Sequence, residues 1–332
     1  MRIHIPRGWE LPDGAATPEE AFVSRRRWIS RASLLGASSL PGPASLLGAS
    51  TSLRGTASLL STSSLLGASS PQPLPARRGR TYVDAGVSEE WVATSYNNFY
   101  EFHPTDKEAV RHRVGKFQIH PWTIEVTGLV SKPKTYDIDD LRRRMPLEER
   151  LYRFRCVEAW AMAVPWIGFP MSALLKEVEP LASAKFVRFV SVMRRAEQPG
   201  IGEAPWYPWP YFEALRLDEA MNELAMFVVG MYGKTLPKQN GAPLRAIVPW
   251  KYGYKNPKSI VRIELVAERP ATFWNQHVPG EYGFYSNVNP AVPHPRWSQA
   301  VEKVIPAMER QRTLPYNGYG QWVASMYTGK EF

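Results

Sequence analysis

The side chain best suited to chemistry in this sequence is Cys156, because it is the only cysteine in a chain of 332 residues. A lone cysteine cannot form an intramolecular disulfide, so it is either a buried inert thiol or a functional thiolate. It stands in the run Arg153-Phe-Arg-Cys-Val-Glu-Ala-Trp160, whose two arginines would favour the thiolate. In an extended strand, Glu158 would point to the same side as the thiol. The run therefore predicts either a structural cysteine or a metal ligand with a carboxylate beside it.

Three further segments carry polar side chains that suit a large cofactor. They are Asn97-Asn-Phe-Tyr-Glu101, Asn240-Gly-Ala-Pro-Leu-Arg245 and Trp250-Lys-Tyr-Gly-Tyr-Lys-Asn-Pro-Lys258. Cations beside glycine-containing backbone suit a phosphate, whereas amides and carboxylates suit a heteroaromatic ring. Each segment alone is compatible with an ordinary polar loop. Together with the single thiol, they indicate a pocket for a phosphorylated pterin whose metal takes one protein thiolate.

Other chemistries have less support in the sequence. The histidines contain no pair spaced by four residues, which argues against a histidine-built zinc or iron site: His4, His103, His112, His120, His277 and His294. No Cys-x-x-Cys-His motif is present, so covalently attached c-type haem is excluded. A hydrolase with a Cys–His pair stays open, because its partners need not be close in sequence. A non-enzymatic secreted binding protein with a structural thiol is the alternative from a different class.

The N-terminal part of the chain has the features of an export signal. Ser24-Arg25-Arg26-Arg27-Trp28-Ile29 is a twin-arginine run, and the Ser-, Leu-, Gly- and Ala-rich segment 32–70 that follows has Arg54 as its one charge. Such moderate hydrophobicity is typical of a twin-arginine signal, although a low-complexity linker would look similar. We therefore predict a leader over 1–76 and a single catalytic domain over 77–332, with a periplasmic location for the mature protein.

Charge and hydropathy argue against nucleic-acid binding and against a membrane-spanning anchor. Ten arginines and four acidic residues fall within 1–80, so +6 of the net charge of +10 belongs to the predicted leader. The basic character of the chain is therefore no sign of nucleic-acid binding. No stretch of eighteen apolar residues occurs, and we expect no stable transmembrane anchor.

The hydrophobic pattern predicts an α+β fold of short, mainly mixed or antiparallel strands with peripheral helices. Regular strand–helix alternation and a Gly-x-Gly-x-x-Gly turn are both missing, which argues against a doubly wound sheet. The 30 prolines interrupt the pattern, so we expect long loops to carry the site. The predicted strands are 122–130, 186–192, 224–232 (or a short helix) and 260–266, and the predicted helices are 137–144, 171–178, 217–221 and 295–304.

The same segments resemble the protein-methionine-sulfoxide reductase family, periplasmic molybdopterin enzymes of the sulfite oxidase fold. The similarity runs from about 97 to 323 and includes Met145-Pro-Leu-Glu-Glu-Arg150, Glu281-Tyr-Gly-Phe-Tyr-Ser-Asn-Val-Asn-Pro290 and His294-Pro-Arg-Trp-Ser-Gln-Ala300. It implies a Mo-molybdopterin cofactor with Cys156 as the molybdenum ligand. It also implies cofactor contacts from Asn97, Tyr100, Glu101, Ser191, Asn240, Arg245, Asn256, Pro257 and Lys258. Ser191 stands where the family has threonine, and Asn256-Pro257-Lys258 stands where Gly-Ile-Lys is typical.

The resemblance implies removal of oxygen from methionine sulfoxide in oxidised periplasmic proteins. It also implies that electrons come from a membrane haem b subunit that draws on quinol. We expect Glu158 to handle a proton close to the metal. The alternative within the same fold is sulfite oxidation, which would need a cluster of arginines over the metal and often an extra dimerisation domain. Beyond about residue 270 the chain is too short for such a domain.

Overall fold

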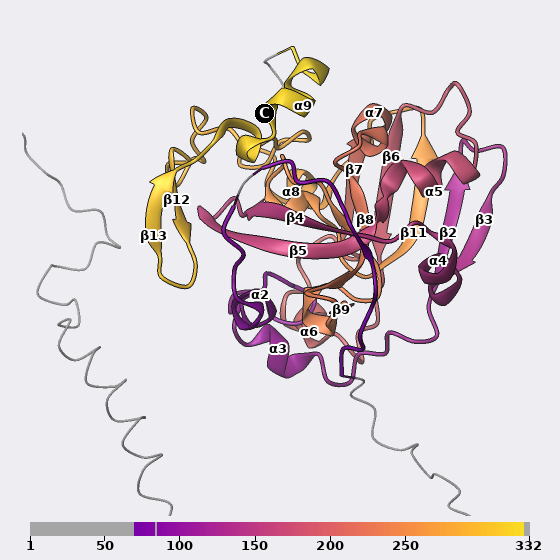
Figure 1. Ribbon diagram of the computed structural model, residues 1–332, viewed down its shortest axis with the longest axis horizontal. Helices are drawn as coiled ribbons and strands as arrows, with labels where there is room; N and C mark the ends of the chain where they lie inside the picture. The colour runs from indigo at the N-terminus through magenta and orange to yellow at the C-terminus, as the bar shows by residue number, and fades with distance from the viewer. Residues whose placement is uncertain (1–69, 84, 329–332) are drawn as a thin grey trace, which may run out of the picture. The chain divides into compact units, whose positions relative to one another are not determined.

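The computed structural model describes residues 70–83 and 85–328. The predicted twin-arginine run at 24–29 and the Ser- and Leu-rich segment that follows it, up to residue 69, lie outside the described residues. The division at 76 stays a prediction. Two β-sheets with short helices around them form the described domain (Figure 1). No helix of the described residues combines the length and the apolar character that crossing a membrane would require.

The larger sheet of the described domain has eight strands and contains the residues around Cys156. Its main order is β1-β4-β5-β12-β13, and β8 also pairs with β5 and carries β9 and β10. The bounds are β1 Arg77–Arg78, β4 Glu148–Arg155, β5 Trp160–Pro170, β8 Met226–Met231, β9 Lys234–Thr235, β10 Arg245–Ile247, β12 Val301–Val304 and β13 Glu309–Arg312. The β12–β13 hairpin, yellow in Figure 1, extends from the sheet edge beyond β5.

The smaller sheet has five strands in the order β3-β2-β11-β6-β7. They are β2 Thr123–Gly128, β3 Lys134–Asp137, β6 Phe186–Ser191, β7 Phe212–Arg216 and β11 Ile260–Val266. β2 and β11 are parallel, whereas the other pairs are antiparallel. Along β2 and β11 buried and exposed positions largely alternate, which confirms the prediction of strands with one wet face.

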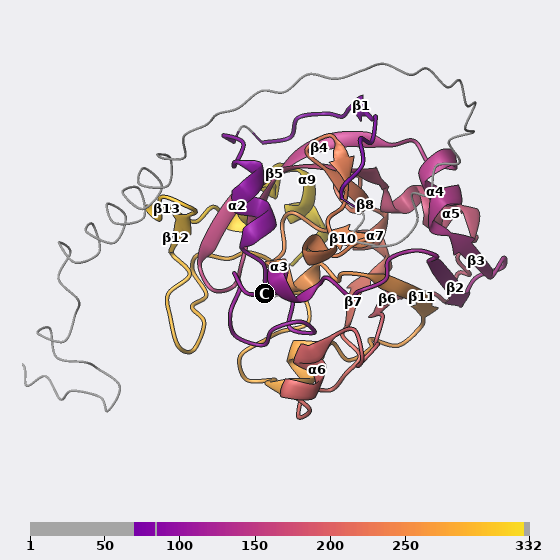
Figure 2. The ribbon, with the colours of Figure 1, turned by 90° about the horizontal axis from the view of Figure 1, so that it is seen from below.

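Short helices surround the two sheets, and this arrangement confirms the predicted α+β class. They are α2 Glu90–Ser95, α3 Val110–Arg113, α4 Ile138–Arg144, α5 Met171–Glu177, α6 Pro199–Glu203, α7 Leu217–Met221, α8 Phe273–His277 and α9 Gly320–Val323, with 3-10 turns at Lys238–Asn240, Gly253–Lys255, Pro315–Gly318 and Ala324–Met326. α2 and α3 lie side by side beneath the larger sheet (Figures 1 and 2). Asp137 caps the N-terminus of α4, since its carboxylate accepts the backbone N–H groups of Asp139 and Asp140. Three predicted helices, 137–144, 171–178 and 217–221, are therefore present.

The fourth predicted helix, over 295–304, is wrong. The segment has apolar residues at helical spacing, but only its last four residues are regular, and they form strand β12. Val301 and Val304 are β-branched and pair with Arg312 and Glu309 across the hairpin. Tertiary pairing with β5 and β13 thus outweighs a weak helical pattern. The ambiguous segment 224–232 is strand β8, buried along its whole length.

The longest strand, β5, was not predicted because it contains prolines. It has eleven residues and includes Pro165 and Pro170. β12 pairs with its first two residues and β8 pairs from Trp166 onward, so Pro165 falls between the two neighbours on that side. A missing N–H is tolerated there, since no neighbouring strand needs it. Close to Pro165, Gly168 is irreplaceable: a Cβ would lie 2.0 Å from the Phe227 carbonyl oxygen.

Candidate active site

An open cavity lies around Cys156, and its empty space amounts to about 880 Å³ when the open solvent at its mouth is included. Its wall comes mainly from three stretches that are far apart in sequence: 96–101, 154–166 and 240–258. The structure therefore brings together the three polar segments and the cysteine run. Of the predicted site residues, those that line the cavity are Asn97, Tyr100, Glu101, Cys156, Glu158, Asn240, Arg245, Asn256 and Lys258.

Cys156 lies in the tight turn that joins β4 to β5. Its backbone N–H donates to the Trp160 carbonyl (2.9 Å), and its carbonyl accepts from the Ala159 N–H (3.0 Å). Ala159 has a φ of 65°, so the chain between Cys156 and Ala159 forms a turn and not an extended strand. Even so, the Cys156 Sγ is 3.9 Å from Glu158 Oε2, because the turn folds both side chains into the cavity.

The two arginines before the cysteine do not keep the thiol ionised, contrary to prediction, because burial raises the Cys156 pKa more than the charge of Arg155 lowers it. Arg153 and Arg155 both form ion pairs with the buried carboxylate of Glu302. Burial, followed by the charge of Glu158, raises the pKa of the Cys156 thiol to about 12. Arginine charge therefore does not produce the thiolate. A metal ion would do so directly, because a thiol that coordinates a metal is deprotonated by it.

Several buried polar atoms in the cavity have no partner within the described protein. They are Asn97 Nδ2, Asn240 Oδ1, and Nε and Nη2 of Arg245. Buried polar groups are almost always hydrogen-bonded, so these atoms indicate a polar ligand of substantial size. The donors and acceptors match those that a pterin ring and a phosphate require. The described residues thus fit molybdopterin.

Two cations that line the cavity, Arg245 and Lys258, are buried with too little negative charge nearby to compensate them. Arg245 is enclosed, and burial lowers its pKa to about 9. Burial also lowers the pKa of Lys258, whose Nζ donates to the Asn98 carbonyl (2.7 Å), and raises the pKa of Glu101. A phosphate in this part of the cavity would offset the cost of burying both cations. These features support the prediction that Arg245 and Lys258 hold the anionic end of the cofactor.

Of the remaining residues predicted to contact the cofactor, two line the cavity and two do not. Tyr100 borders the cavity and packs edge-on against Trp274, with ring centroids 5.0 Å apart. The Asn256 side chain accepts the Val248 N–H (2.7 Å) while the residue lines the cavity. Ser191 and Pro257 do not line it.

These two residues lie behind the wall. The Ser191 hydroxyl donates to the Lys258 carbonyl (2.7 Å), and the Pro257 carbonyl accepts the Ala246 N–H (3.0 Å). Both residues therefore support the segment that carries Lys258, and their direct contact with a cofactor stays a prediction.

Sequence reasoning missed the groups that hold Glu158. Its Oε2 accepts from Asn98 Nδ2 (3.1 Å) and Trp160 Nε1 (3.0 Å), and it pairs with Lys107 Nζ (3.1 Å). Burial acts to raise the Glu158 pKa, but these partners together lower it below its ordinary value. Asn98 belongs to a motif that the sequence singled out, whereas nothing in the sequence marks Lys107.

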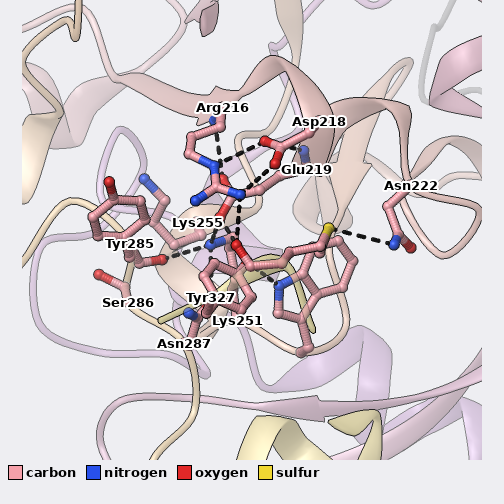
Figure 3. A network of polar contacts seen from close by, with 12 residues as sticks. Arg216, Asp218, Glu219, Asn222, Lys251, Lys255, Tyr285, Ser286, Asn287 and Tyr327 are labelled. Atoms are coloured by element: carbon pink, nitrogen blue, oxygen red, sulfur yellow. Dashed lines mark hydrogen bonds and ion pairs between the residues drawn. The ribbon is translucent and has the colours of Figure 1, made fainter. Parts of the chain in front are cut away.

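Only one of the three lysines in 250–258 reaches the cavity. Lys251 pairs with Glu219 (2.6 Å), and Lys255 pairs with Glu213; all four side chains are at most 1% exposed. Figure 3 shows Lys251 within a network that includes Glu219 and Tyr327. The two buried pairs anchor the backbone on either side of Gly253 and Tyr254, which line the cavity.

We expect Lys251→Met to lower the free energy of unfolding by about 3–5 kcal/mol, because it leaves the Glu219 carboxylate buried without its cation. Lys132→Met is the matched control, since Lys132 forms a pair of the same length with Glu179 in solvent and should cost about 0–1 kcal/mol. Denaturant titration of both variants measures the difference. Equal losses of unfolding free energy in the two variants would show that burial of the Lys251–Glu219 pair does not matter for stability.

The cavity, with one thiol and several buried polar atoms that have no partner among the described residues, defines a cofactor-binding protein. The model of the oxidoreductase molybdopterin binding domain matches residues 111–274. The chain is 56% identical over 242 residues to the protein-methionine-sulfoxide reductase catalytic subunit MsrP of Burkholderia mallei, covering 72% of each chain. It is 52% identical over 247 residues to MsrP of Ralstonia nicotianae, covering 72% of this chain and 74% of that one. The chain belongs to the family of protein-methionine-sulfoxide reductase catalytic subunits.

Membership of this family confirms the predicted enzyme class, molybdopterin-dependent oxidoreductase, and the predicted Mo-molybdopterin cofactor. The relatives are catalytic subunits by name, which implies a partner subunit. Among solved structures, the chain resembles the sulfane dehydrogenase SoxCD of Paracoccus pantotrophus, with 16% identity and a TM-score of 0.40 over 60% of this chain and 46% of that one.

Proposed function

We propose that this protein reduces methionine sulfoxide in oxidised proteins of the periplasm. The observation that carries the proposal is the single thiol of Cys156 in a cavity where buried amide and guanidinium atoms have no partner among the described residues. The bound molybdenum would supply two-electron oxygen-atom transfer, in which the sulfoxide takes up two electrons and two protons and yields a thioether and water.

The side chains around the thiol suit this substrate. Tyr100, Trp274 and Tyr282 line the cavity, and aromatic side chains suit contact with the sulfur and methyl group of the substrate. Glu158 lies next to the thiol with Lys107 on its carboxylate. We propose that Glu158 handles the proton at this position, and that its partners fix the direction of the carboxylate.

Sulfite oxidation is less well supported by the cavity. A dianionic substrate would need several arginines over the metal, and Arg245 is the one arginine among the described residues that line the cavity. Its side chain is buried and donates to the Asn240 carbonyl (2.7 Å).

Assays of the purified protein distinguish directly between sulfoxide reduction and sulfite oxidation. With reduced viologen dye, we expect turnover of methionine sulfoxide, both free and within an oxidised protein, and no oxidation of sulfite. Sulfite oxidation without sulfoxide reduction would overturn the proposal.

We further propose that the electrons come from a membrane haem b partner that draws on quinol. No haem attachment motif occurs in the sequence, so a donor outside this chain fits the composition. Reconstitution with membranes that contain the partner should replace the dye as electron source.

We expect the change of Arg25, Arg26 and Arg27 together to lysine to retain the protein in the cytoplasm. The three arginines provide two overlapping twin-arginine registers, so replacement of Arg25 alone would leave the Arg26-Arg27 register intact. Fractionation followed by immunoblotting measures the outcome, with the single Arg25→Lys variant as the control. Periplasmic delivery of the triple variant would show that another export route carries the protein.

A further inference from the structure

The turn that carries Cys156 is held by a segment almost 150 residues further along the chain. β12 lies parallel to β5, and the Lys303 N–H donates to the Ala159 carbonyl (2.8 Å). Ahead of β12, Trp297 Nε1 donates to the Val157 carbonyl (2.8 Å). Two carbonyl groups of the turn are thus fixed from outside it.

Arg155 joins the cysteine itself to the same segment. Its side chain is fully buried and donates to the Cys156 carbonyl. The same guanidinium reaches Gln299 Oε1 (2.8 Å), Thr313 Oγ1 (3.2 Å) and Glu302 Oε2 (3.0 Å). Only a planar group with several donors can bridge four acceptors in this way. Arg155 therefore transmits the position of the β12–β13 hairpin to the backbone of Cys156.

Glu302 provides the negative charge that keeps this guanidinium in place. It is fully buried on β12 and accepts from Arg153, Arg155 and Gln311, the last at 2.7 Å. Two cations thus depend on one carboxylate. Loss of that carboxylate would leave buried charge without compensation, which favours local opening of the turn.

We infer that Glu302, acting through Arg155, is a positioning residue for the sulfur of Cys156. The inference rests on the proposed role of Cys156 as the metal ligand. Groups that hydrogen-bond to a metal-binding residue fix its orientation, and their loss costs about 10- to 100-fold in affinity or activity. Neither Glu302 nor Arg155 lines the cavity, so neither would touch substrate or cofactor.

The single cysteine allows a direct test, because any thiol reagent reports on Cys156 alone. In protein prepared without cofactor, we expect Glu302→Gln and Arg155→Lys to raise the rate of alkylation by iodoacetamide by about tenfold or more. Glu309→Gln is the matched control, since Glu309 is an exposed carboxylate on β13 of the same hairpin. Its rate should equal that of the wild type.

Denaturant titration separates a positioning role from general loss of stability. Faster alkylation that merely follows the fall in unfolding free energy would overturn the inference, as would unchanged rates in both variants. If these variants do not fold, the milder Gln299→Ala takes their place. It removes a donor to Val157 and an acceptor for Arg155, and an unchanged rate there would likewise overturn the inference.

The loaded enzyme gives two independent readouts. In Glu302→Gln we expect kcat per molybdenum to fall about 10- to 100-fold while KM for the sulfoxide stays the same, since the residue does not contact substrate. In the wild type, cofactor loading should protect Cys156 from alkylation. Absence of that protection would refute Cys156 as the ligand, whereas the cofactor-free rates would still decide the role of Glu302.

Discussion

Replacement of Cys156 by serine should lower the rate of methionine sulfoxide reduction by more than about 100-fold. Loss of a residue that only hydrogen-bonds to a metal ligand costs about 10- to 100-fold, so loss of the ligand itself should cost more. The reason is that no other thiol exists in the chain to take its place. The change is nearly isosteric at a buried site, so the fold should persist. Activity per molybdenum, with circular dichroism as the check on folding, measures the effect.

The same variant should still contain molybdenum. Asn97, Asn240, Arg245 and Lys258 remain available to hold the cofactor through its ring and phosphate. Met162→Leu is the control, because Met162 lines the same cavity and the change conserves volume while it leaves the thiol and the partners of Glu158 in place. Normal turnover of Cys156→Ser would end the assignment of this residue as metal ligand.

Replacement of Arg245 by alanine should weaken retention of the cofactor by about ten- to a hundredfold, since a charge-assisted contact contributes about 1.5–3 kcal/mol. Arg245 is enclosed, and two of its three guanidinium nitrogens have no partner in the part of the chain that the structure describes, so a phosphate would be their main ligand. The protein should purify with substoichiometric molybdenum. Turnover per bound molybdenum should be close to normal, because the residue serves binding and not the reaction.

Arg262→Ala provides the matched control for Arg245→Ala. Arg262 lies on β11 in solvent, where it pairs with Glu125 (2.8 Å). Its loss should leave the molybdenum content unchanged. Full metal loading of Arg245→Ala with poor turnover would instead place this arginine at the substrate face and would favour the sulfite-like alternative.

The sequence predicts the chemistry of the site better than the geometry that creates it. Asn97, Cys156 and Arg245 were identified by residue type and local motif, and the structure places all three on one cavity. Lys107 and Glu302 were not, because their roles depend on contacts with residues far away in sequence. A sequence motif carries information only about residues that are close to one another along the chain.

The prediction of strands is limited in the same way, because it too depends on local sequence. Alternating burial reveals β2 and β11, which have one wet face. β5 is buried on both faces and contains prolines, so neither alternation nor composition marks it. Pro165 is acceptable only because of where two other strands end, which a local pattern does not record.

The pairing of β12 with β5 also sets an order of events during synthesis. Ala159 and Val157 leave the ribosome long before Trp297 and Lys303, which fix their carbonyl groups. A nascent chain that has just completed the cysteine turn therefore lacks the contacts that hold it. Such long-range contacts form late, because the intervening loop must close first. We therefore expect metal capture only after residues 297–303 have been made, and a chain truncated before residue 297 should be synthesised and yet remain without molybdenum.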